Sequence, residues 1–361
     1  KSLIYLDNSA TTRADEQVVT AMNKYHLEFY GNPSSLHRMG LEAEKAMDKA
    51  RRQISDFLKV DHNTITFVSG GTESNNLAIG SAINKNKRRG NKIITSIIEH
   101  PSVLEVFRSY EKSGYDVSYI DVDEKGFLNL EQLKEALDEK TILVSIMKVN
   151  NEIGTIQDTR EIAKMIKGKL PHCIFHSDCV QAIGKVPVEP LSEGIDLLTF
   201  SGHKIHGPKG IGAIYVRKDL NLQPILFGGG QERGLRSGTE NVAGIVGMGV
   251  AVEQLSQFSN QVNHLKLLKS KAVELLKREL DEIHFNSHEG EEYAPHILNI
   301  SIEDVKSEIL LHLLEKKDIF VSSGSACSSK KNSQSHVLKS MGLPKEFIEG
   351  SLRINPYSSV R

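Results

Sequence analysis

The sequence predicts an α/β protein with a large and a small domain. Short apolar runs in the middle of the chain alternate with amphipathic segments: KIITSII, VSYIDV, TILVSIM, CIFHSD and DLLTF, with EQLKEALDE and REIAKMIKGK as intervening helices. Strands that are apolar along their whole length and separated by helices are typical of a mostly parallel sheet covered by helices on both faces. At 361 residues the chain is long for one hydrophobic core, which favours a second, smaller domain.

The N-terminal elements follow in order. LIYL at residues 3–6 predicts a short strand, and the turn-forming DNSATT follows it. Helical spacing begins at Val18, Val19 and Met22, and GNPSS at residues 31–35 is a loop. Apolar residues recur at steps of three and four over residues 41–58, which predicts an amphipathic helix. TITFVSGGTESNNLAIGSAI then predicts a strand, a Gly-Gly turn and a helix that opens near Thr72.

The pattern changes after Val250. A long helix (VNHLKLLKSKAVELLKREL), a strand pair around ILNISI and another helix (SEILLHLLEKKDI) precede a Ser-rich loop, SSGSACSSKKNSQS. That loop contains no long apolar residue, so we expect it to be mobile. The predicted division is a large domain at residues 14–250 and a small α+β domain formed by residues 1–13 and 251–361.

Composition excludes several classes of function. The 45 basic and 46 acidic residues nearly cancel, which gives no reason to expect a nucleic-acid or acidic-membrane partner. No apolar run reaches membrane-spanning length, and the N-terminus lacks the pattern of a signal peptide, so we expect a cytoplasmic protein. Three cysteines without C-x-x-C spacing indicate reduced thiols rather than a disulfide framework.

Polar residues follow five of the predicted strands: Thr72, His100, Asn151, Asp178 and Lys204. Ligands of open α/β sheets bind off the carboxyl ends of the strands, so these segments could converge on one cleft. Lys204 lies at the centre of SGHKIHGPKG, between two apolar runs, where burial and cationic neighbours could lower the pKa of its amine and let it bind a carbonyl cofactor covalently. On spacing alone, a solvated loop lysine is the commoner interpretation.

The motifs resemble those of the class V aminotransferase-like pyridoxal-phosphate enzymes (fold-type I), and among them the NifS/IscS-type cysteine desulfurases. The motifs occur in the family's order and cover nearly the whole chain: YLDNSATT, GNPSSLHRMG, GGTESNN, EH, VNNEIGT, DCVQAIG, SGHKIHGPKG, RSGTEN and SSGSACSS. The resemblance implies pyridoxal 5'-phosphate as cofactor and a homodimer.

The resemblance also implies the roles of the residues at the cofactor. Lys204 would hold it covalently, Asp178 would face the ring nitrogen, Gln181 would reach the ring hydroxyl, and His100 would stack on the ring and assist proton transfers. The phosphate would be held by Thr72, Ser201 and His203, joined by Thr239 from a second subunit. Gly71, Asn151 and Gly202 would also bind the cofactor. Without the resemblance, the commoner interpretations are that GGT is an ordinary βα turn, that Asp178 is a helix cap and that His100 is a polar loop residue. The GGT turn could still bind a phosphate, because helix N-termini suit phosphates.

Cys327 separates a desulfurase from its aminotransferase relatives. An exposed thiol on a mobile loop could travel, and with a pKa near 8.5 about a tenth of it is thiolate at slightly alkaline pH. The alternative is an incidental surface cysteine, although free cysteines are usually buried. Cys173 and Cys179 are assigned to packing. A metal site built from His172, Cys173, His176 and Cys179 is conceivable, but alternation along a strand would divide them between two faces, and we predict no metal.

Arg353 in GSLRI lies on a short strand-like run and could bind a substrate carboxylate with both arms of its guanidinium. By resemblance it would do so, with Asn151 beside it; many such arginines are simply surface residues. Two features depart from the family. INPYSSVR stands where relatives have a Gly-containing motif, so the chain could be truncated, and Cys179 and Val180 occupy positions usually filled by small or hydroxyl residues.

The predicted function is desulfuration of L-cysteine to L-alanine, with a persulfide on Cys327 that supplies a scaffold protein in Fe–S cluster or thiocofactor synthesis. The alternatives are a selenocysteine lyase or aminotransferase on the same scaffold and, less favoured, a non-catalytic sulfur-relay or regulatory subunit.

Overall fold

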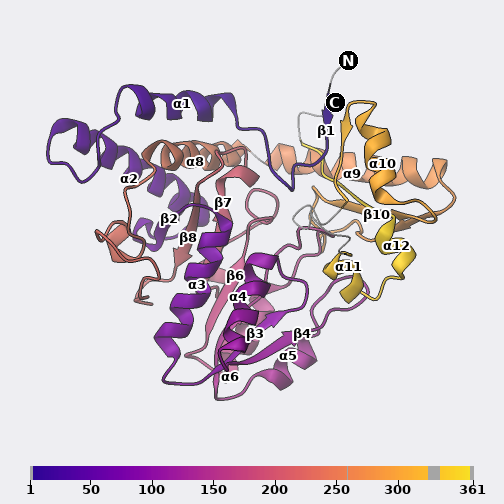
Figure 1. The fold of residues 1–361 in the computed structure, drawn as a ribbon, viewed down its shortest axis with the longest axis horizontal. Helices are drawn as coiled ribbons and strands as arrows, with labels where there is room; N and C mark the ends of the chain where they lie inside the picture. Colours follow the sequence, from indigo (N-terminus) through magenta and orange to yellow (C-terminus); the bar gives the residue numbers. More distant parts are fainter. Residues whose placement is uncertain (1–2, 258, 324–333, 358–361) are drawn as a thin grey trace.

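The computed structural model describes residues 3–257, 259–323 and 334–357. Its main sheet has seven strands in the order β2-β8-β7-β6-β5-β3-β4, and all run parallel except β8 (Figure 1). The strands are β2 (Ile65–Val68), β3 (Lys92–Ser96), β4 (Asp116–Ile120), β5 (Thr141–Ser145), β6 (Ile174–Asp178), β7 (Leu197–Ser201) and β8 (Gly212–Val216). The predicted α/β class with a mostly parallel sheet is confirmed.

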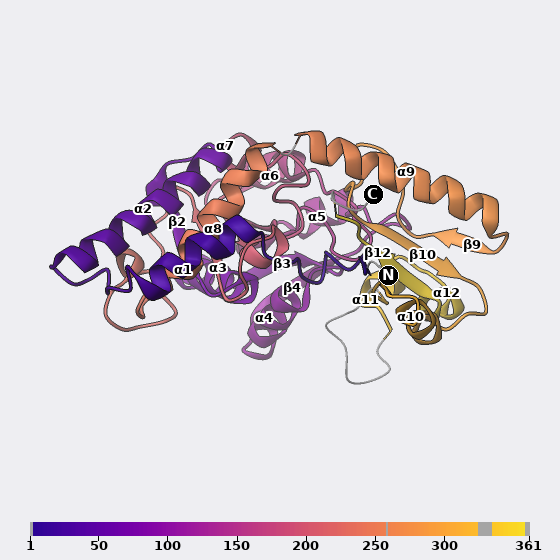
Figure 2. The ribbon, with the colours of Figure 1, turned by 90° about the horizontal axis from the view of Figure 1, so that it is seen from above.

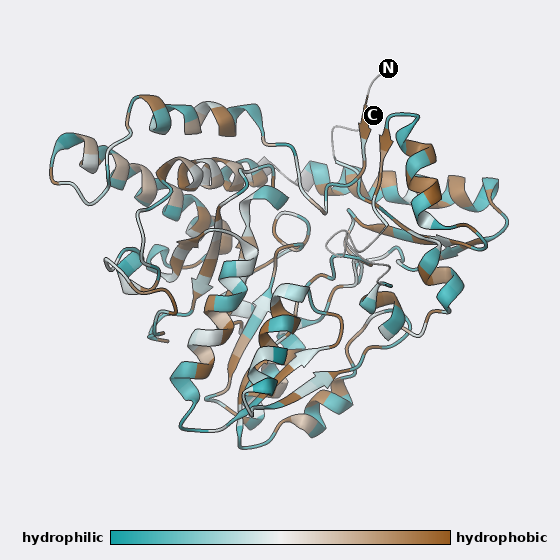
Figure 3. Cartoon of the chain, viewed as in Figure 1, coloured by the Kyte–Doolittle hydropathy of each residue, from teal (hydrophilic) through white to brown (hydrophobic). Residues whose placement is uncertain are grey.

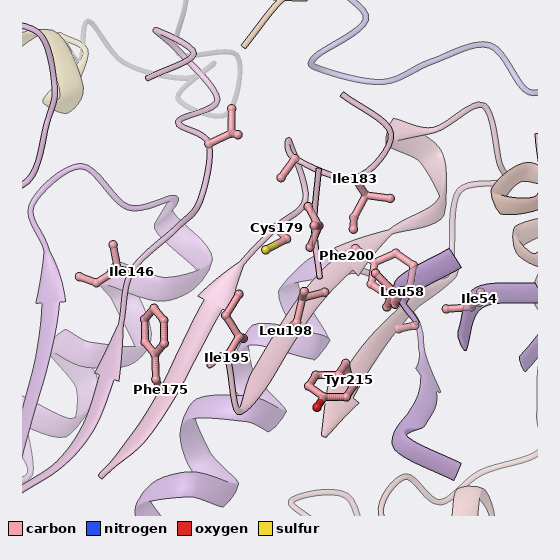
Figure 4. Close-up of a cluster of buried hydrophobic side chains, with 14 of the residues drawn as sticks. Ile54, Leu58, Ile146, Phe175, Cys179, Ile183, Ile195, Leu198, Phe200 and Tyr215 are labelled. Carbon is pink, nitrogen blue, oxygen red and sulfur yellow. The ribbon is translucent and has the colours of Figure 1, made fainter. Parts of the chain in front are cut away.

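Helices cover both faces of this sheet (Figure 2). One face carries α3 (Gly71–Asn86) and α4 (Pro101–Lys112), and the other carries α2 (Arg38–Leu58), α6 (Thr159–Lys169) and α8 (Val242–Gln254). Successive strand residues enter different cores, because side chains alternate across a sheet: Leu197 packs with the α3 side and Leu198 with the α2 side. Figure 3 shows the apolar strands between helices whose outer faces are hydrophilic, and Figure 4 shows the core around Phe175, Leu198 and Phe200.

The remaining helices of this part lie at its edges: α1 (Glu16–Leu27) packs on α8, α5 (Leu130–Ala136) contacts α6, and α7 (Pro190–Glu193) is a single turn. The sequence did not predict α4 or α8. Helix α8 is almost entirely buried and rich in glycine, so it shows no amphipathic stripe. It also runs across residue 250, where we placed the domain boundary; the division at 14–250 stays a prediction.

A three-stranded antiparallel sheet, in the order β12-β10-β9, lies in the C-terminal part. Its strands are β9 (Ile283–Phe285), β10 (Leu298–Ile302) and β12 (Ser351–Ile354), and its helices are α9 (Ser259–Glu279), α10 (Ser307–Glu315), α11 (His336–Ser340) and α12 (Lys345–Glu349). ILNISI is therefore one central strand with two partners rather than a strand pair. Short strand β1 (Ile4–Tyr5) pairs with β11 (Ile319–Phe320), so the N-terminal segment returns to this part, as expected. No helix in the described ranges is long and apolar enough to cross a membrane.

Candidate active site

The parallel strands end at one edge of the sheet, and most of the predicted site residues follow those ends. His100 comes four residues after β3, Asp178 is the last residue of β6, and Lys204 ends a 3₁₀ turn (Gly202–Lys204) after β7. Because β8 runs antiparallel to β7, the chain turns back at this edge, and Lys204 lies on that connection. Asp178 and Lys204 both act electrostatically on His100, which brings the three residues into one site.

Lys204 is held by the N-terminal segment. Its amine donates hydrogen bonds to the backbone carbonyls of Ser9 and Ala10, the second at 2.8 Å. Gln181 Nε2 donates to the same Ser9 carbonyl at 3.0 Å. The amine of Lys204 and the amide of Gln181 therefore share one acceptor, the Ser9 carbonyl oxygen. This shared acceptor links the connection after β7 to the segment after β6.

Asp178 is 4% exposed, and two donors fix its carboxylate. Asn75 Nδ2 donates to Oδ2 and the Val180 N–H donates to Oδ1, both at 2.9 Å. Asn75 Nδ2 also donates to Ser102 Oγ at 2.9 Å, and Ser102 Oγ lies 2.7 Å from His100 Nδ1. A chain of hydrogen bonds therefore runs from Asp178 through Asn75 and Ser102 to His100.

His100 is the N-cap of α4. The Ser102 N–H donates to Nδ1 at 3.1 Å, so Nδ1 is an acceptor and the proton of the neutral ring lies on Nε2. Burial lowers the pKa of His100, and the negative charge of Asp178 opposes that shift. The ring is therefore neutral at pH 7, and its Nδ1 accepts hydrogen bonds from the first turn of α4.

A phosphate fits the N-terminus of α3. Gly70, its N-cap, supplies no side-chain cap, so N–H groups of the first turn are available to an anion. Gly71 lies against Ser201: a Cβ on Gly71 would stand 3.8 Å from Ser201 Cβ. The buried Ser201 hydroxyl has no hydrogen-bond partner among the described residues, as expected for a group that binds an absent ligand. Thr72, in the same turn, is exposed.

His203 lies beside this turn of the chain. Its Nδ1 is 3.0 Å from Thr11 Oγ1, and burial followed by the charges of Lys204 and Lys209 lowers its pKa to about 4. A neutral imidazole can donate one N–H to a phosphate oxygen. Thr239 is exposed on a separate loop after Gly238, and no hydrogen bond in the described ranges links it to Ser201 or His203 within one chain.

Arg353 of β12 reaches the large sheet from the C-terminal part. Its Nη1 donates to the backbone carbonyl of Asn151 at 2.8 Å, so the two residues lie side by side as expected. Its Nη2 donates to Asp7 Oδ1 at 3.2 Å. The guanidinium is buried, with 3% of the side chain exposed. This excludes the interpretation of Arg353 as a simple surface residue.

The comparisons with known proteins agree with this geometry. The family model described as aminotransferase class V matches residues 4–354. The chain belongs to the class V aminotransferase family. This family member is 44% identical over 353 residues to the cysteine desulfurase IscS of Methanosarcina thermophila, which covers 98% of the chain and 86% of the relative. It is 42% identical over 354 residues to IscS of Clostridium botulinum, covering 98% and 89%.

Solved structures give the same result. A NifS-like protein superimposes with a TM-score of 0.93 at 39% identity, covering 99% of this chain and 94% of that one. SspA in complex with cysteine superimposes with a TM-score of 0.86 at 33% identity, covering 98% and 99%. The protein is thus a pyridoxal-phosphate enzyme of the cysteine desulfurase group, and the predicted family, fold class and cofactor are confirmed.

Cys327 of this family member lies outside the described residues. The other two cysteines are fully buried, and burial raises the pKa of each thiol to about 12, so both are packing residues. His176 faces away from them: its ring lies between Ser145 Oγ (2.7 Å) and Thr199 Oγ1 (2.9 Å), and burial lowers its pKa to about 3. No cluster of three or more possible metal ligands occurs in the described ranges.

The sequence missed three residues of the site: Ser9, Asn75 and Ser102. Ser9 and Asn75 belong to recognised motifs, YLDNSATT and GGTESNN, but nothing in the motifs shows what they contact. Asn75 stands one helical turn after Thr72, so its position on the same side of α3 was a usable signal.

Proposed function

We propose that the protein converts L-cysteine to L-alanine and collects the sulfur as a persulfide on Cys327. The observation that carries the proposal is the Ser9 carbonyl shared by Lys204 and Gln181, because it sets the amine of Lys204 beside the segment that follows Asp178 at the end of β6. A lysine there can hold the cofactor while Asp178 keeps its ring nitrogen protonated.

Each residue has a separate task in this proposal. Pyridoxal phosphate, when bound, supplies a carbonyl that captures the substrate amine and a ring that stores electrons. The N-terminus of α3, Ser201 and His203 bind the phosphate. Lys204, once released by the substrate, moves the Cα proton, and neutral His100 assists the proton transfers as a hydrogen-bond donor through its Nε2–H. Cys327 attacks the substrate sulfur as a thiolate: the S–S bond forms as the Cβ–Sγ bond of the substrate breaks, and the electron pair of that bond goes to Cβ, which takes up a proton to give alanine.

The test is the product. Purified protein given L-cysteine should release L-alanine, measured by amino-acid analysis. Cys327→Ala should keep the absorbance of the bound cofactor and lose persulfide transfer; continued sulfur delivery would contradict the role of Cys327. Lys204→Ala should lose the adduct that borohydride fixes. Lys209→Ala, an exposed lysine of the same connection, is the matched control and should keep it.

We also propose a homodimer in which Thr239 completes the partner's phosphate site. Large apolar side chains are exposed where α1 and α2 meet, at the left of Figure 1, and in the loop after β8: Leu27, Tyr30, Leu36 and Phe227. Sedimentation should give twice the chain mass. Mixed dimers of Lys204→Ala and Thr239→Ala chains should regain activity, because one of their two sites then has both native residues; dimers that stay impaired would assign Thr239 to its own chain's site.

The sulfur acceptor in this proposal is a scaffold protein of Fe–S cluster or thiocofactor synthesis, and the proposed location is the cytoplasm. A selenocysteine lyase or aminotransferase is the alternative, and a substrate panel that measures alanine against keto acid separates them. A colourless protein that binds no cofactor would instead favour a non-catalytic subunit.

A further inference from the structure

Arg353, the residue expected to bind the substrate carboxylate, already binds a carboxylate of this chain. Its Nη2 donates to Asp7 Oδ1 at 3.2 Å, and its Nη1 donates to the Asn151 carbonyl. Its Nε is buried and has no hydrogen-bond partner among the described residues. The guanidinium thus has one carboxylate partner through a single bond, and its Nε remains a donor that a second carboxylate oxygen could use.

Asp7 is the more exposed member of this ion pair. The side chain of Arg353 is 3% exposed, whereas that of Asp7 is 22% exposed. Asp7 also lies within electrostatic reach of Lys204, the proposed attachment point of the cofactor. An amino acid bound between Lys204 and Arg353 would therefore bring its carboxylate to the oxygen atoms of Asp7.

We propose that Asp7 is a placeholder carboxylate, which occupies Arg353 in the free enzyme and is displaced from it by the carboxylate of the amino-acid substrate. This inference rests on the proposed function, which makes an amino acid the ligand. It makes Asp7 a specificity-determining residue. An anion that has only a carboxylate must displace Asp7 from Arg353 with that one interaction. L-cysteine can displace it more easily, because its amine and its thiol also contribute to binding.

Displacement has a consequence for protons. The charged and titratable groups around Asp7 are Tyr5 on its own strand, Arg353 of β12 and Lys204 of the connection after β7, and Glu152 acts on Arg353 from the loop after β5. Burial raises the pKa of Asp7, and Arg353 opposes that shift. Once Arg353 turns to the ligand, Asp7 binds a proton more readily, so ligand binding takes up protons and strengthens as the pH falls.

The test uses 3-mercaptopropionate, which has the carboxylate and thiol of cysteine but no amine to react with the cofactor. Isothermal titration calorimetry of the cofactor-loaded enzyme gives its Kd, and buffers of different ionisation enthalpy give the proton uptake. Asp7→Asn should lower the Kd about fivefold, the equivalent of one partly buried ion pair, and should abolish proton uptake. A Kd that is unchanged or higher in this variant, or no binding to either protein, overturns the proposal.

Three controls keep the test independent of folding and of the overall function. Asp158→Asn makes the same change at the exposed N-cap of α6 and should leave the Kd unchanged. Asp7→Glu keeps the charge and should not tighten binding. In the unmodified enzyme the Kd should fall as the pH is lowered from 7 toward 5, that is, toward the ordinary pKa range of a carboxyl group; a flat profile also contradicts the proposal. If the enzyme releases alanine but the Kd for 3-mercaptopropionate is the same in the Asp7→Asn variant, this inference is refuted and the proposed function is not affected.

Discussion

Replacing Asn75 by alanine tests the hydrogen-bond chain between Asp178 and His100. Asn75 is 1% exposed and donates to a charged oxygen of Asp178 and to Ser102 Oγ, both at 2.9 Å. A hydrogen bond to a charged group contributes about 1.5–3 kcal/mol and a neutral one about 1 kcal/mol. Alanine regains about 0.6 kcal/mol of helix propensity, and Asn75 Oδ1 has no partner to lose. We therefore expect the free energy of unfolding to fall by about 2–3 kcal/mol.

The assay is urea unfolding of the protein stripped of cofactor, since a bound ligand would add its own stabilisation. Asn76→Ala is the matched control: it changes the next residue of the same helix, whose half-buried side chain donates to the Thr72 carbonyl at 2.9 Å. We expect its unfolding free energy to stay within about 0.5 kcal/mol of the unmodified protein. Equal losses in the two variants would refute the argument, because they would show that the bond to Asp178 contributes nothing.

Three further predictions concern stability and reactivity. Burial raises the pKa of Glu152 from 4.5 to about 7, so its contribution to stability is present below pH 4.5 and is lost as the pH rises through 7. Glu152→Gln should remove a pH dependence of about 3 kcal/mol from the unfolding free energy, and an unchanged pH profile would contradict this. Arg51→Met should lower the unfolding free energy by about 3–5 kcal/mol in urea titrations, because Arg51 and Glu232 form a buried pair with two 2.8 Å bonds, and adding Glu232→Leu should recover part of that loss rather than deepen it. Ellman's reagent should label one thiol per native chain, Cys327, and three in denaturant; labelling of the two buried cysteines without denaturant would show that their thiols are accessible.

The sequence predicted elements whose pattern is local and missed those that depend on distant neighbours. Strand β5 was found because it is apolar over most of its length, and β6 because it begins with an apolar run. Helix α8 was missed because it is buried on nearly all sides, so its apolar residues show no single face. Helix α4 was missed although its cap was named: His100 has the extended backbone expected before a proline, and the helix starts at that proline.

The same division holds within the site. The motifs identified Asp178, His100 and Lys204, and the structure brings these residues together. The contacts between them come from residues remote in sequence, such as Asn75 on α3, 103 positions before Asp178. The pairing of Asp7 with Arg353 spans 346 positions, so no local pattern could reveal that the guanidinium is already occupied.

The hydrogen bonds from Lys204 to Ser9 and Ala10 bear on how the protein is made. The floor of the site comes from the tenth residue and its neighbours, and the same segment is anchored by Asn355, whose N–H donates to the Leu6 carbonyl at 2.7 Å. The segment around Ser9 therefore pairs with residues that are synthesised about 345 positions later. A nascent chain that stops before Asn355 lacks this anchor beneath Lys204, and it should not yet bind the cofactor.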